Sequence, residues 1–182
     1  MKDHPRFWLV TAASTARDCW VRITSPETDP VGESVMERLL ADQPLDGPLE
    51  LTVWNRGPRR GDLLWTGGGT FSAVSERAVG VLESIGATGW RSVPATTRFA
   101  NGDPLTGYHV LVVTGRSGEL FGQKRRPDRP GVDPSQGWDG SDVFAPNGRP
   151  HFTFCVTHRV REAFDAAGLE RVVFRDPARY GS

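Results

Sequence analysis

The pattern of apolar and polar positions predicts one structural unit that occurs twice in this chain. Each copy reads as a short strand, a hydroxyl residue and a helix of two to three turns that ends at glycine. The first copy runs from Thr70 to Gly86 and the second from Phe152 to Gly168, and a constant offset of 82 positions aligns them. Each helix is followed by a further apolar run, so the two predicted strand–helix–strand units extend over roughly residues 70–93 and 152–174.

Both predicted helices carry one apolar face and recognisable ends. Ser75 and Thr157 stand where a side chain can cap the free backbone N–H groups of a helix start. Apolar residues then recur at spacings of three and four positions, as on one side of a helix: Ala78, Val81, Leu82 and Ile85 in the first copy, Val160, Ala163, Phe164 and Ala167 in the second. Gly86 and Gly168 are expected to supply the left-handed residue that ends each helix. Leu82 and Phe164 hold equivalent central positions, so we expect them to be equally buried.

The rest of the chain adds further elements without a regular alternation of strand and helix. Its apolar runs predict one helix, Glu33 to Ala41, and four strands: Phe7 to Ala12, Cys19 to Thr24, Leu49 to Trp54 and Tyr108 to Thr114. This order favours the α+β class over a doubly wound fold. We therefore expect a single domain over residues 1–182, with a mixed or antiparallel sheet covered by short helices and the duplicated unit within it.

The segment from Gly115 to Arg149 has no helical or strand periodicity and is predicted to be one long irregular loop. Loops of this length inside a compact domain are uncommon and are usually either functional or disordered. Its first half is basic, whereas its second half carries Asp133, Asp139 and Asp142 around Trp138.

Composition limits the classes of function. The chain has 22 basic and 22 acidic residues, which argues against a general attraction to nucleic acid or to membranes. Its two cysteines show no CxxC spacing, and Cys155 lies in an alternating strand-like run, as expected of an apolar core thiol. The apolar stretch near the N-terminus is short and does not read as a signal peptide, so we expect a cytoplasmic protein.

Motifs for catalysis, cofactors and metals are incomplete. The glycines from Gly67 to Gly69 could present N–H groups to a phosphate, but they precede a strand and lack the lysine of a P-loop. Ser117 does not complete the GxSxG nucleophile elbow. Cys155 and His158 could share a metal, yet a third and a fourth ligand are not evident. We therefore expect no catalytic residues, no cofactor and no metal.

Two aromatic side chains in the acidic half of the predicted loop call for an explanation. Trp138 and Phe144 could fold back onto the core and fix the loop. Alternatively, Trp138, Asp139, Asp142, Asp133 and Phe144 could form a protein-contact surface, in which the rings act as anchors and the acids steer a basic partner. The sequence leaves both interpretations open.

The two units also resemble a known family. AVSERAVGVLESIGATGW (residues 73–90) and CVTHRVREAFDAAGLERVVF (155–174) share the pattern V-[S/T]-x-R, followed by a short helix, a glycine and a strand. Together with WDGSDVF before the second unit, this resembles the immunity proteins of bacterial polymorphic toxin systems, in the branch allied to the myxobacterial double-CxxCG proteins. The resemblance extends over roughly residues 63–174, although the CxxC pairs of that branch are missing here.

The resemblance implies a cytoplasmic protein that binds and neutralises a cognate toxin by direct contact, without catalysis of its own. The alternative is an enzyme that processes small molecules or nucleotides, or a ligand-binding module, either of which would use the acidic loop and the turn from Gly67 to Gly69.

Overall fold

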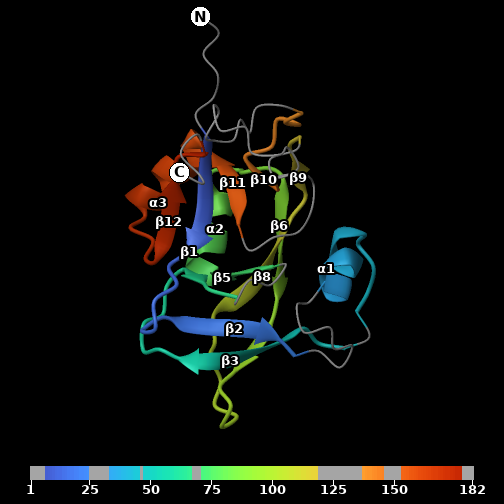
Figure 1. The fold of residues 1–182 in the computed structure, drawn as a ribbon. Coiled ribbons are helices and arrows are strands. Elements are labelled where there is room, and N and C mark those ends of the chain that lie inside the picture. The colour runs from blue at the N-terminus through green and yellow to red at the C-terminus, as the bar shows by residue number, and fades with distance from the viewer. Residues whose placement is uncertain are drawn as a thin grey trace, which may run out of the picture.

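The chain adopts an α+β fold with three sheets and three helices among the residues that can be described (Figure 1). The computed structural model describes residues 7–24, 33–45, 47–66, 71–118, 137–145 and 153–177. The elements, in chain order, are β1 (Phe7–Ala12), β2 (Cys19–Ile23), α1 (Glu33–Leu40), β3 (Glu50–Arg56), β4 (Leu63–Leu64), β5 (Ser72–Ser75), α2 (Glu76–Ser84), β6 (Trp90–Pro94), β7 (Thr96–Arg98), β8 (Tyr108–Val113), β9 (Gly115–Arg116), β10 (Val143–Ala145), β11 (Phe154–Thr157), α3 (His158–Ala166) and β12 (Val172–Arg175).

The α+β class and the mixed or antiparallel pairing are confirmed, but the strands form three sheets. Their orders are β12-β1-β11-β10-β9, β4-β5-β8-β6 and β2-β3-β7. Most pairs are antiparallel, whereas β3 with β7 and β9 with β10 run parallel. The predicted irregular loop over residues 115–149 is wrong in part, because β9 and β10 lie within it and β10 pairs with β11. A run of two or three paired residues is too short to produce a visible period in the sequence.

The predicted duplication is confirmed. The strand β5, helix α2 and strand β6 have the same lengths and offsets as β11, α3 and the start of β12. Both helices are followed by a glycine in the left-handed conformation, with φ of +58° at Gly86 and +62° at Gly168. A residue with a Cβ would be strained there, which is why glycine ends both helices.

The duplication reaches further than the sequence indicates, because β1 is the counterpart of β8. β8 lies between β5 and β6, and β1 lies between β11 and β12. The registers agree: Ser75 pairs with Tyr108 as Thr157 pairs with Phe7, and Trp90 pairs with Val113 as Val172 pairs with Ala12. In Figure 1 the blue N-terminal strand accordingly lies between the orange-red elements of the C-terminal half.

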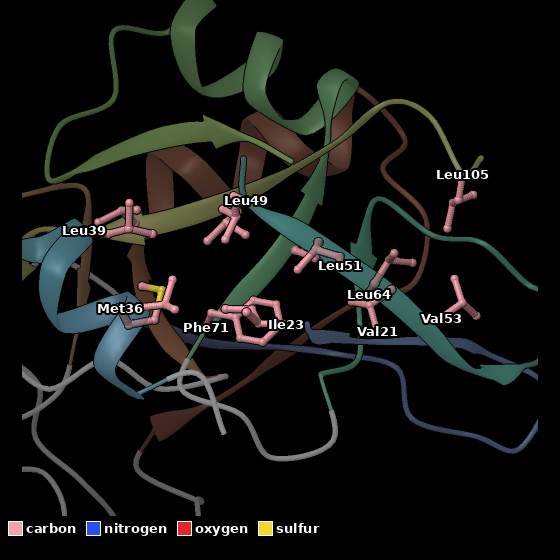
Figure 2. Close-up of a cluster of buried hydrophobic side chains, with 14 of the residues drawn as sticks. Val21, Ile23, Met36, Leu39, Leu49, Leu51, Val53, Leu64, Phe71 and Leu105 are labelled. Atoms are coloured by element: carbon pink, nitrogen blue, oxygen red, sulfur yellow. The ribbon is translucent and has the colours of Figure 1, made fainter. Parts of the chain in front are cut away.

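Two hydrophobic clusters hold the three sheets and the helices together. One is formed by the apolar faces of α2 and α3 with side chains of β1, β11 and β8, and it includes Leu82 and Phe164. The other fills the space between the β2-β3-β7 sheet, helix α1 and the sheet that contains β5 and β8 (Figure 2). The predicted burial of Leu82 and Phe164 is confirmed, since only 1% and 5% of their surfaces are exposed.

Truncation of either side chain to alanine is expected to weaken the fold. Leu82→Ala and Phe164→Ala should each lower the free energy of unfolding by about 2–5 kcal/mol, because each removes buried methylene or ring carbons and leaves a cavity. Chemical denaturation monitored by circular dichroism measures this. Glu83→Ala, on the exposed side of α2, is the matched control and should change the free energy by less than about 0.5 kcal/mol. Equal effects of core and control variants would contradict the duplicated-core interpretation.

Candidate functional site

Trp138 packs against the outer face of the sheet that contains β1 and β10. Its ring meets that of Phe7 edge to face, with 4.9 Å between the centroids, and lies 6.1 Å from the ring of Phe144. Its indole N–H donates to the carbonyl of Ser141 at 2.8 Å. Trp138 is half-buried in this cluster. Leu9 and Cys155, which are buried, belong to the same cluster. The contacts are those of an aromatic side chain that fixes its segment to the core.

The other members of the predicted contact surface lie in different environments. Phe144 is completely buried in β10, so its ring is not accessible to a partner and the proposed anchor role for it is wrong. Its ring packs against those of Phe7 and Trp138, as in the alternative in which the two rings fold back onto the core. Asp133 lies outside the described residues.

Asp139 lies at the surface, but both of its carboxylate oxygens bind backbone N–H groups. One accepts from Arg116 at 2.8 Å and the other from Ser141 at 2.9 Å. Partial burial acts to raise the pKa of Asp139, and these hydrogen bonds outweigh it and lower the pKa. The residue therefore stays ionised at neutral pH and closes the turn before β10.

Asp142 is the centre of an internal network. Its carboxylate accepts from the hydroxyl of Thr157 at 3.0 Å, from the backbone N–H of Thr88 at 3.1 Å and from the guanidinium of Arg159. Another guanidinium nitrogen of Arg159 donates to the carbonyl of Ile85, at the C-terminal end of α2, at 2.6 Å. The predicted capping role of Thr157 is wrong, because its hydroxyl binds this carboxylate and makes no side-chain cap bond to α3.

Asp62 occupies the equivalent place in the first half, and no motif in the sequence singles it out. Its carboxylate accepts from the hydroxyl of Ser75 at 2.5 Å, from the backbone N–H of Glu170 at 2.7 Å and from Arg77 at 3.5 Å. Arg77 in turn donates to the carbonyl of Ala167, which is the C-cap of α3. Ser75 also accepts from the N–H of Ala78 and so caps α2, as predicted.

The V-[S/T]-x-R pattern therefore has a structural meaning. In each copy, the hydroxyl residue and the arginine bind one aspartate that precedes the neighbouring strand. The arginine then reaches the C-terminal carbonyls of the helix in the other copy, where a positive charge is favourable. We call these two networks the aspartate nodes: Asp62 with Ser75 and Arg77, and Asp142 with Thr157 and Arg159.

The described surface offers a different candidate site on the outer face of the β2-β3-β7 sheet. Trp54 is the one large hydrophobic residue in the described chain that is markedly exposed, with 51% of its surface accessible. It follows the buried Val53 and therefore points away from the core. Trp20 and Arg22 of β2 point the same way on either side of buried Val21. We define the tryptophan face as Trp20, Arg22, Thr52, Trp54 and Arg98.

Cross-strand register brings these side chains together. Arg22 pairs with Thr52, and Thr52 pairs with Arg98 of β7, so the three residues form a row across the sheet. The ring of Trp20 lies 5.6 Å from that of Trp54 and 6.5 Å from that of Trp65. The sequence predicts both strands, and the alternation in CWVRI and LTVW places the tryptophans on one face. The alternation alone does not show which face is left open to solvent.

Other predicted sites receive no support from the part of the chain that can be described. The turn from Gly67 to Gly69 lies outside the described residues. Cys155 is buried, which raises the pKa of its thiol to about 12 and suits an inert core position. Within the described ranges, no cluster of three or more histidine, cysteine, aspartate or glutamate side chains could hold a metal. None of the helices described has the length and apolar character of a membrane span.

Comparisons with known proteins do not assign a family. No protein-family model matches the chain, and no curated protein matches it either.

The aspartate nodes can be tested through stability. Asp142→Asn and Asp62→Asn should each lower the free energy of unfolding by about 1.5–3 kcal/mol, because the new NH₂ group faces donors that the carboxylate oxygens had accepted from. Thermal and denaturant unfolding at pH 7 measure the loss, and Glu83→Gln is the exposed control. An effect no larger than that of the control would show that the nodes do not stabilise the fold.

The Asp142 node also predicts a dependence on pH. Burial acts to raise the pKa of Asp142, but the bonds from Arg159, Thr88 and Thr157 hold it below its usual value of 3.8. A depressed folded-state pKa contributes stability that is present above the unfolded-state value and is lost as pH falls below it. The difference in unfolding free energy between wild type and Asp142→Asn should therefore be constant near neutrality and shrink below about pH 4. A difference that is unchanged down to about pH 2.5 would contradict this assignment.

Proposed function

We propose that this protein binds and neutralises a cognate bacterial toxin by direct contact and catalyses no reaction of its own. The observation that carries the proposal is the tryptophan face, where an exposed indole lies among arginines on an open sheet. Tryptophan and arginine are the residues most enriched at the energetic centres of protein interfaces. The exposed ring of Trp54 is therefore available as the anchor of such an interface.

In the enzymatic alternative the acidic loop would supply the catalytic carboxylates. The two of them that the structure describes, Asp139 and Asp142, accept hydrogen bonds from other parts of the fold. Asp139 accepts hydrogen bonds from two backbone N–H groups, and Asp142 accepts them from a threonine, an arginine and a backbone N–H. The pKa of each is lowered rather than raised, so neither is suited to donate a proton near neutral pH. These facts favour the binding function over the enzymatic alternative.

The resemblance to immunity proteins supports the same conclusion. It rests on the repeated V-[S/T]-x-R pattern, and both copies of that pattern form equivalent aspartate nodes. A toxin-neutralising protein of this kind acts where its own cell would be damaged, so we infer a cytoplasmic location.

A growth experiment tests the proposal. Genes for toxins and their inhibitors lie side by side, so the C-terminal domain of the protein encoded directly upstream is the probe. Its induced expression in a bacterial host should arrest growth, and co-expression of the chain should restore growth. The purified proteins should form a complex with a dissociation constant below about 1 μM.

The controls separate neutralisation from other effects. Leu82→Ala, which weakens the fold, should protect less well at raised temperature, whereas Glu83→Ala should protect fully. An upstream domain that is harmless, or that the chain neither binds nor counteracts, would overturn the proposed function. Turnover of a small molecule by the purified chain would favour the enzymatic alternative.

A further inference from the structure

We propose that the tryptophan face is the docking surface for the partner and that it receives an acidic protein surface, with the ring of Trp54 as the central anchor. This inference rests on the proposed function and names the place and the chemistry of the contact. The tryptophan face takes the place of the partner-binding surface predicted from the sequence, which comprised Asp133, Trp138, Asp139, Asp142 and Phe144.

The anchor is held in position before any partner binds. Trp54 packs against Trp20, which in turn packs against Trp65 at the edge of β4. The backbone N–H of Val21 donates to the carbonyl of Trp65 at 2.9 Å and fixes this edge of the sheet. A ring supported in this way loses little conformational entropy when a partner covers it, which favours a slow dissociation.

The charge around the anchor has one dominant sign. In residues 15–24 and 47–66, Asp18 and Asp62 are buried and bound to Arg171 and Arg77 respectively, and Glu50 is half-buried. The arginines whose exposure can be described in the same segments are all exposed: Arg17, Arg22, Arg59 and Arg60. Arg98 of β7 is exposed beside them, and the exposed Asp103 in the turn after β7 is the one acid near it in that turn. The chain as a whole has no net charge, so this end of the molecule is locally basic and complementary to an acidic surface.

The arrangement fits a protein better than a nucleic acid or a second copy of this chain. Binding of single strands uses several exposed aromatic rings on which successive bases stack. Here Trp54 is exposed, whereas Trp20 and Trp65 are half-buried against each other. A symmetric pairing of two tryptophan faces would bring Arg22 and Arg98 close to the same arginines of the other copy. One anchor surrounded by arginines is the usual composition of a protein-binding hot spot.

The binding experiment uses the full chain and the C-terminal domain encoded directly upstream, with kinetics measured by surface plasmon resonance. Trp54→Ala should raise the dissociation rate by about tenfold or more, because it removes the anchor. The double variant Arg22→Glu with Arg98→Glu should lower the association rate by about tenfold and reduce its dependence on salt. Arg22 and Arg98 are exposed, so their double variant should keep the wild-type melting temperature. Trp54→Ala also removes the contact with Trp20, so its kinetics are measured well below its own melting temperature.

A matched pair of substitutions controls for net charge. Arg116→Glu with Arg175→Glu makes the same change in charge at two exposed arginines on β9 and β12. This pair should leave the association rate within about twofold of wild type at physiological salt, since its positions lie on another sheet. Asp139→Asn, in the surface predicted from the sequence, should leave the affinity unchanged.

The outcomes separate the two proposals. If the wild-type chain does not bind the domain, the proposed function fails and the docking surface fails with it. If it binds and the Trp54 and arginine variants bind equally well, or the control pair weakens binding as much, the docking surface is wrong and the proposed function stands. Tighter binding of a single-stranded oligonucleotide than of the domain, or a dimer that Trp54→Ala dissociates, would also overturn the acidic protein as occupant.

Discussion

Two aspartates bind the halves of this protein to each other. Asp62 and Asp142 each gather a hydroxyl, a backbone N–H and an arginine, and each arginine continues to the carbonyl end of the opposite helix. An ion pair that is half exposed contributes little by itself. Here the carboxylates are nearly buried and accept several bonds at once, so loss of one group would leave several donors without a partner. The packing of α2 on α3 therefore depends on the two aspartates, which lie outside both helices.

The aspartate nodes are connected with the candidate docking surface through strand β4. Asp62 immediately precedes β4, and Trp65 follows it directly and forms a parallel bridge with Trp20. The tryptophan face is therefore attached to a rigid part of the fold. Trp138 lies on the sheet that contains β1 and β10, and its ring packs against Phe7 instead of facing solvent. The tryptophan face lies on the separate β2-β3-β7 sheet, outside the duplicated units.

Features that depend on residues close together in the sequence could be predicted, whereas features that depend on contacts between distant segments could not. The two amphipathic helices, their glycine ends and the burial of Leu82 and Phe164 follow from local periodicity, and all are confirmed. The Asp62 network was not predicted, for two reasons. Asp62 and Asp142 lie 80 positions apart, which differs from the repeat offset of 82, and their hydrogen-bond partners come from distant segments. The strands β2 and β3 were predicted, whereas the tryptophan face on them was not. Which face stays open depends on the packing of whole sheets, and a strand does not encode that packing.

The position of β1 also has a consequence for how the chain is made. The strands of the first half, β4 to β8, lie within residues 63–113, so this half can close while the rest is still being synthesised. β1 is synthesised before the first half, whereas its neighbours β11 and β12 are synthesised after it. Until then an apolar strand with unpaired N–H and C=O groups is open to association with other chains. The sheet around β1 therefore closes only after β11 and β12 have been synthesised, and a nascent chain interrupted before residue 154 leaves both edges of β1 unpaired.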